Sequence, residues 1–128
     1  MRKLLLGLAL SLVATSASAQ WVLVETSASG TNLYADPATK KRTGNVVRMW
    51  ILYDYSKPLQ MVGGKTYYSA RYYDQYNCAE RTNQTFQVAA FAGKMLNGDV
   101  VGTHNQPFDK SFIAPGTAAE AMLEYACQ

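Results

Sequence analysis

The stretch KTYYSARYYDQYNC, residues 65–78, decides most of the fold. It is rich in tyrosine, which favours β-strands, so it predicts one long strand that ends at Cys78. Side chains alternate between the two faces of a strand, so one face would carry Cys78 with Thr66, Tyr68, Ala70, Tyr72 and Tyr76. The opposite face would be more polar and would carry Tyr67 and Tyr73.

A second segment, at the C-terminal end, predicts a helix. Pro115-Gly116 indicates a turn, and Thr117-Ala-Ala-Glu120 matches a capping box, in which a hydroxyl and a carboxylate accept hydrogen bonds from free backbone amides. Residues 118–126 are nearly all good helix formers. Apolar residues recur in this segment at three- and four-residue spacing and form one stripe: Ala119, Met122, Leu123, Ala126 and Cys127.

Residues 1–19 have the pattern of a secretory signal peptide. Arg2 and Lys3 precede an apolar run that ends at Val13, and Ala17-Ser18-Ala19 fits a cleavage site. The apolar run has about ten residues, whereas a membrane-spanning helix needs roughly twenty. We therefore expect a single domain, residues 20–128, that is periplasmic or secreted. It should have no membrane span and, because no cysteine lies near the cleavage site, no lipid anchor.

Cys78 and Cys127 are the only cysteines in the sequence. Export would bring them into an oxidising compartment, where two cysteines allow one intramolecular disulfide. Such a bond would join the end of the tyrosine-rich strand to the apolar stripe of the helix. A redox-active pair is the alternative, but it requires a close Cys-x-x-Cys arrangement that the sequence lacks.

Strand and turn patterns alternate along the rest of the chain. Further strands are predicted at residues 21–26, 31–36, 45–55, 84–95 and 99–104. Ser56-Lys57-Pro58 and Gly63-Gly64 predict a loop, and Asn97-Gly98 predicts a hairpin turn. No helical pattern separates the strands, so the fold class is α+β: an antiparallel sheet of about six strands, with the C-terminal helix packed on one face and tied by a disulfide.

The charge balance gives little support to nucleic-acid binding. Twelve basic and nine acidic side chains give a formal charge of +3, and removal of Arg2 and Lys3 with the signal peptide lowers it to about +1. The one remaining basic run is Lys40, Lys41 and Arg42. We interpret this run as a solvated loop. A site for an anionic polymer or an extracellular partner is the alternative.

The predicted helix is too short to cover the predicted sheet. A helix of about twelve residues is roughly 18 Å long, and six strands at about 4.8 Å spacing extend further. The uncovered surface must be polar, strongly curved or covered by a partner. Trp50, Tyr67 and Tyr73 are candidate binding residues there, for another protein or for a second copy of the chain. Cross-strand aromatic packing is the alternative explanation.

We do not expect an enzyme. The candidates for nucleophilic catalysis, His104, Asp109 and Ser111, lie close in sequence, but no nucleophile motif surrounds Ser111. A single histidine with scattered carboxylates lacks the ligand spacing of a metal site, and no cofactor is predicted.

Several short segments are similar to those of a known family, and they follow one another over nearly all of the exported part of the chain. They are Trp21, Tyr34-Ala35-Asp36, Val46-Val47-Arg48-Met49-Trp50, Asp54-Tyr55, Ser69, Cys78, Arg81, Pro115-Gly116-Thr117 and Cys127. In this respect the chain resembles the surface-adhesin protein E-like family of exported bacterial proteins. The resemblance implies an antiparallel sheet with a disulfide-bound C-terminal helix.

The same resemblance implies a non-enzymatic binding module. The best-known member of the family is a lipoprotein adhesin that binds host matrix and serum proteins such as vitronectin, laminin and plasminogen. This chain lacks the lipid-accepting cysteine, which favours a periplasmic location. A structural or accessory protein of the bacterial envelope is the alternative function, and a small hydrolase ranks below it.

Overall fold

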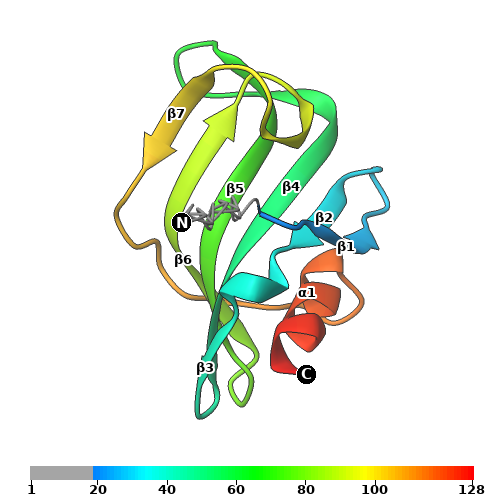
Figure 1. The fold of residues 1–128 in the computed structure, drawn as a ribbon, viewed down its shortest axis with the longest axis vertical. Coiled ribbons are helices and arrows are strands. Elements are labelled where there is room, and N and C mark those ends of the chain that lie inside the picture. Colours follow the sequence, from blue (N-terminus) through cyan, green and yellow to red (C-terminus); the bar gives the residue numbers. More distant parts are fainter. Residues whose placement is uncertain (1–18) are drawn as a thin grey trace, which may run out of the picture.

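The tyrosine-rich strand and its neighbours form the centre of one antiparallel sheet (Figure 1). The computed structural model describes residues 19–128, so the predicted signal peptide, apart from Ala19, lies outside the described residues. The strand order is β1-β2-β4-β5-β6-β7, with β3 paired to β4 and β8 paired to β6. The strands are β1 (Val22–Thr26), β2 (Asn32–Ala35), β3 (Lys41–Thr43), β4 (Val46–Gln60), β5 (Thr66–Asn77), β6 (Thr82–Phe91), β7 (Val100–His104) and β8 (Ser111–Phe112).

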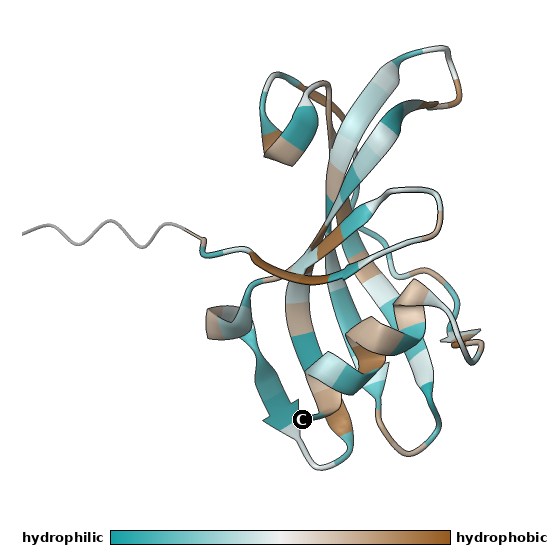
Figure 2. Cartoon of the chain, turned by 90° about the vertical axis from the view of Figure 1, so that its right-hand side faces the viewer, coloured by the Kyte–Doolittle hydropathy of each residue, from teal (hydrophilic) through white to brown (hydrophobic). Residues whose placement is uncertain are grey.

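One α-helix, α1 (Ala118–Cys127), lies across the lower part of one sheet face (Figure 2). The apolar stripe of the helix is buried there, as the sequence predicted, with Met122 and Leu123 each 1 % exposed. Two 3-10 helices, η1 (Pro37–Thr39) and η2 (Lys94–Leu96), interrupt the loops. The hydrophobic core consists of Leu33, Ala35, Val47, Met49, Ile51, Tyr76, Ile113, Met122, Leu123 and Ala126. The predicted α+β class is thus confirmed.

The predicted disulfide is also confirmed. Cys78, just beyond β5, is bonded to Cys127 in the last turn of α1, with their Cα atoms 5.9 Å apart. At the other end of the helix the Thr117 hydroxyl accepts a hydrogen bond from the Glu120 amide at 3.3 Å. The Glu120 carboxylate accepts a hydrogen bond from the Gly116 amide at 3.2 Å. The predicted capping box would use the amide of the next residue, Thr117.

Two predicted connections are wrong. β4 does not end before Ser56-Lys57-Pro58 but runs on to Gln60, and an irregularity in its pairing with β5 between Asp54 and Leu59 accommodates the proline. The predicted two-residue turn at Asn97-Gly98 is instead a longer loop that contains η2. That loop is closed by hydrogen bonds from the Gly93 amide to the Asn97 carbonyl and from the Ala92 amide to the Asp99 carbonyl. Consequently β6 ends at Phe91, short of the predicted Met95.

The η2 loop packs on the sheet face opposite α1. Its Met95 amide donates to the Asp54 carboxylate at 2.8 Å, and its Leu96 amide donates to the Ser69 hydroxyl at 2.8 Å. Met95 and Leu96 both have positive φ angles, and these two anchors offset the strain of that conformation. Part of the sheet surface that was predicted to be uncovered is therefore covered by the η2 loop of the same chain.

Candidate functional site

Trp50 and Tyr73 lie directly opposite each other on β4 and β5, on the sheet face away from α1. Their ring centroids are 5.0 Å apart. The Arg71 guanidinium lies 5.2 Å from the Trp50 ring and 5.9 Å from the Phe91 ring. The Arg48 guanidinium lies 4.3 Å from the Phe86 ring. We call this surface the aromatic–arginine face: Arg48, Trp50, Arg71, Tyr73, Phe86 and Phe91.

This face is held rigidly by the sheet beneath it. Leu52, which lies directly opposite Arg71 in the pairing of β4 with β5, is fully buried. A hydrogen bond of 2.9 Å from Arg48 Nε to Gln75 Oε1 fixes one guanidinium. Each arginine still presents free N–H donors to solvent, because both side chains are exposed. Aromatic rings interleaved with arginine are the residue types enriched at protein–protein contacts.

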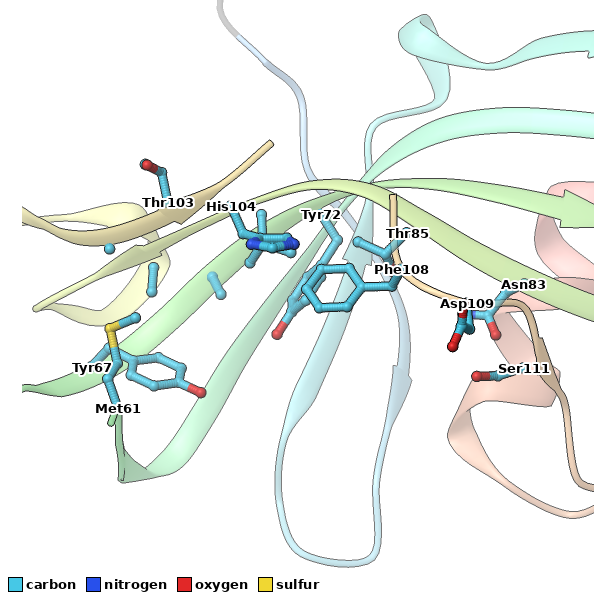
Figure 3. Close-up of a pocket in the computed structure, with 14 residues that line it drawn as sticks. Met61, Tyr67, Tyr72, Asn83, Thr85, Thr103, His104, Phe108, Asp109 and Ser111 are labelled. Atoms are coloured by element: carbon cyan, nitrogen blue, oxygen red, sulfur yellow. The ribbon is translucent and has the colours of Figure 1, made fainter. Parts of the chain in front are cut away.

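Tyr67 does not belong to this face. It was predicted to lie with Tyr73, but its ring packs edge-on against Tyr55 at 5.7 Å, and it lines a cavity on the helix side of the sheet (Figure 3). Simple alternation along β5 therefore fails between Tyr67 and Ser69, next to the pairing irregularity of β4.

The basic run has a structural role that the sequence did not reveal. The Lys40 Nζ donates to the Tyr125 carbonyl at 3.2 Å and to the Gln128 carbonyl at 3.1 Å, and Arg42 donates to the Cys127 carbonyl at 3.0 Å. These two cations therefore cap the C-terminal end of α1, where free carbonyls and the helix dipole favour positive charge. Lys41, between them, is exposed on β3. No local pattern could have indicated this, because the partners are 85 residues apart in sequence.

The cavity on the helix side has a volume of about 570 Å³. Its floor consists of small or slender residues on β5, β6 and β7, and Met61 from the β4–β5 hairpin closes one end (Figure 3). Phe108 forms part of the wall and packs on His104, with ring centroids 4.4 Å apart. The lining residues are Met61, Tyr67, Ala70, Tyr72, Asn83, Thr85, Val88, Ala90, Gly102, Thr103, His104, Phe108, Asp109 and Ser111.

The three residues considered for catalysis all line this cavity, but they do not form a triad. Asp109 and Ser111 lie near Asn83 at one end, whereas His104 packs on Phe108 nearer the middle (Figure 3). Within residues 19–128 no hydrogen bond joins any two of the three side chains. A general base activates a nucleophile through a hydrogen bond, and in this conformation the three side chains do not provide one.

A buried carboxyl group, Asp74, lies beside the cavity and was not singled out from the sequence. It is 2 % exposed and accepts hydrogen bonds from the Thr85 hydroxyl at 2.7 Å and from the Tyr76 hydroxyl at 3.4 Å. Burial raises the pKa of Asp74 from an ordinary 3.8 to about 6, although these hydrogen bonds and the Asn83 amide partly oppose the rise. Asp74 lines a second cavity of about 490 Å³, which also contains the first turn of α1.

A cluster of tyrosine side chains lies on the same side of the sheet, and three of its members, Tyr53, Tyr55 and Tyr72, line the second cavity with Asp74. The Tyr55 and Tyr72 hydroxyls are hydrogen-bonded at 3.0 Å, and the Tyr53 ring packs edge-on against Tyr72 with centroids 5.0 Å apart. Burial raises the pKa of Tyr53, Tyr55, Tyr72 and Tyr76 above the usual value of 10, so their hydroxyls remain protonated donors at neutral pH. The alternation pattern predicted that Tyr72 and Tyr76 face inward, but not that Tyr76 is hydrogen-bonded to a buried carboxyl group.

The sequence profile of the surface-adhesin protein E family matches residues 21–128. The chain belongs to the surface-adhesin protein E family. No protein with a curated description matches the chain significantly. Within the described part of the chain, no helix is long and apolar enough to span a membrane. The same residues contain no group of three His, Cys, Asp or Glu side chains that could hold a metal ion.

Solved structures of protein E from Haemophilus influenzae have the same fold as this member of the surface-adhesin protein E family. Crystal form II of that protein is similar with a TM-score of 0.65 and 13 % identity, covering 88 % of this chain and 91 % of the other. Protein E from a non-typeable strain gives a TM-score of 0.60 and 17 % identity, covering 88 % and 78 % of the two chains. At this low identity the likeness establishes the fold.

Proposed function

We propose that this protein is an exported, non-enzymatic adhesin of the bacterial envelope that binds host matrix or serum proteins. The observation that carries the proposal is membership of the surface-adhesin protein E family over residues 21–128. The absence of hydrogen bonds among the His104, Asp109 and Ser111 side chains in the described residues supports a binding role over a hydrolytic one.

The aromatic–arginine face is the surface we assign to the protein partner. Trp50 and Tyr73 offer large contact area with few rotatable bonds, so ordering them on binding costs little conformational entropy. Arg48 and Arg71 are held over aromatic rings at 4.3 and 5.2 Å, and their free donors can bind carboxylates on a partner in a bidentate manner. Lys41 lies opposite Arg48 on β3 and extends the positive charge of the surface.

Binding of the purified, oxidised protein to immobilised vitronectin, laminin and plasminogen tests the proposal. We expect saturable binding to at least one of them, and a loss of tenfold or more in the Trp50→Ala/Tyr73→Ala double variant. Leu23→Ser is the matched control, because Leu23 is an exposed apolar side chain on the edge strand β1. Absence of binding to all three proteins would contradict the assignment as an adhesin. Equal losses of binding in the double variant and in Leu23→Ser would contradict the assignment of the aromatic–arginine face as the binding surface.

The second candidate function is an accessory protein of the envelope whose partner is periplasmic. The sequence favours it through the absence of a cysteine near the predicted cleavage site. Fractionation of cells that produce the protein distinguishes the two functions. Accessibility of the protein to protease on intact cells supports an adhesin, and protection until the outer membrane is opened supports the accessory role.

A further inference from the structure

The cavity on the helix side of the sheet is built by the pairing of the strands. Ala70 on β5 lies opposite Ala90 on β6, which lies opposite Gly102 on β7, so three small residues form a row across the sheet. The next row contains Tyr72, Val88 and His104. Large side chains are therefore missing from the central strands at this level, although β5 is otherwise rich in tyrosine.

The walls of the cavity come from segments that fold back over this floor. Met61 in the β4–β5 hairpin packs closely on Gly102. A Cβ atom added at position 102 would lie only 2.8 Å from the Met61 Sδ and would overlap the thioether. Nearer the middle of the cavity the Phe108 amide donates to the Thr85 carbonyl at 2.9 Å, and the Gln84 side-chain amide donates to the Phe108 carbonyl at 3.0 Å. These contacts fix both wall segments against the strands that form the floor.

The two ends of the cavity differ in chemistry (Figure 3). Met61, Tyr67, Ala90 and Gly102 make one end apolar and aromatic, whereas Asn83, Asp109 and Ser111 make the other end polar. Among the lining residues within 19–128, Asp109 is the only carboxylate, and neither lysine nor arginine is present. The buried Asp74 carboxyl lies in the adjoining cavity, which shares Tyr72, Asn83 and Thr85 with this one.

We propose that this cavity is a binding site for a small cationic amphiphile, with its apolar body on the Ala70–Ala90–Gly102 floor and its ammonium group at Asp109. The volume of about 570 Å³ is in the range of small-molecule sites. The Phe108 ring, which lies between the apolar end and Asp109, favours a cation through its electron-rich face (Figure 3). The site is separate from the aromatic–arginine face, which is on the opposite side of the sheet, so it does not depend on the proposed adhesin function.

Three probes with one body and different head groups test the assignment: 4-phenylbutylamine, 4-phenylbutanol and 4-phenylbutyrate. Each is titrated into the oxidised wild-type protein at pH 8 and low salt, and the methyl resonances of Met61, Val88 and Ala90 are followed by NMR. We expect saturable shifts of these methyl groups with the amine, and binding of the carboxylate at least tenfold weaker. Equal affinity for the three probes, or shifts elsewhere with these methyl groups unmoved, would overturn the proposal.

Two pairs of variants locate the body and the head group. Phe108→Ala opens the wall of the cavity and should weaken binding of the amine at least fivefold. Phe112→Ala removes an 88 % exposed ring outside the cavity and should leave this binding unchanged. Asp109→Asn should reduce the affinity for the amine to that for the alcohol, whereas Asp99→Asn should leave it unchanged. If Asp109→Asn and Asp99→Asn behave alike, the assignment of the ammonium site is wrong. The wild-type titration decides the location independently of how well any variant folds.

Discussion

Asp74 makes the stability of this protein depend on pH in a direction opposite to that of most carboxylates. Because the pKa of Asp74 is about 6 in the folded protein and 3.8 is its ordinary value, the native state holds the proton more tightly than the unfolded state. Raising the pH from about 4 to about 6 removes that proton from the native state and leaves a charge buried among tyrosine rings. The contribution of Asp74 to stability should therefore fall over this window and be lowest above it.

The size of the effect follows from the difference between the two pKa values. A difference of one pKa unit corresponds to about 1.4 kcal/mol, so the rise from 3.8 to about 6 corresponds to about 3 kcal/mol over the whole titration. About 2 kcal/mol of this falls between pH 4 and pH 7, because the unfolded chain is already largely ionised at pH 4. Asp74→Asn removes the titration and keeps an oxygen that can accept from the Thr85 hydroxyl. The variant should gain about 2 kcal/mol relative to wild type as the pH rises from 4 to 7.

Urea unfolding of the oxidised proteins at half-unit intervals from pH 4 to pH 8 measures this difference. Subtracting wild type from Asp74→Asn cancels the contributions that the two proteins share, and the change of the difference with pH is independent of any constant offset between them. Asp99→Asn, an exposed carboxylate outside the site, is the control and should parallel wild type. A difference between Asp74→Asn and wild type that stays constant within 0.5 kcal/mol over the window would refute the argument from burial.

Three other predictions concern the framework. Cys78→Ala/Cys127→Ala should lower the free energy of urea unfolding by about 4 kcal/mol, because the disulfide closes a loop between residues 49 positions apart. A loss below about 1 kcal/mol would show that the bond does not restrict the unfolded chain. Lys40→Ala/Arg42→Ala should lower stability by about 1 kcal/mol and loosen α1 in amide hydrogen exchange, whereas Lys41→Ala should do neither. Gly102→Ala should displace the flexible Met61 side chain with a loss of less than about 1 kcal/mol, visible as a shift of the Met61 methyl resonance; an unmoved methyl would contradict the contact.

Much of the fold could be predicted because its determinants are local or unique. The tyrosine-rich strand, the Thr117 cap and the apolar stripe each lie within one segment, and two cysteines permit one pairing. The errors fell where a local pattern has more than one structural solution. Pro58 was predicted to end a strand, but a pairing irregularity accommodates it, and Asn97-Gly98 forms part of a longer loop because Asp54 and Ser69 bind the amides of that loop.

The candidate sites were less predictable, since they depend on contacts between distant segments. Tyr67 changes face because strand alternation breaks near a neighbouring irregularity, which sequence periodicity does not reveal. The cavity requires Met61, Gly102 and Phe108 to meet from three different segments. The row of small residues at 70, 90 and 102 could have indicated it, but only once the register of β5, β6 and β7 was known.

The attachment of α1 imposes an order of folding. A ten-residue helix is too short to be stable alone in water. Its first turn is bound by Arg81, whose guanidinium lies 2.9 Å from the Glu120 carboxylate, and its last turn by Lys40, Arg42 and Cys78. Each of these partners belongs to the sheet or its loops, so the helix can form only after β3 to β6 have paired. We therefore expect the amides of α1 to be the last to gain protection during oxidative refolding, and the first to lose it when the disulfide is reduced.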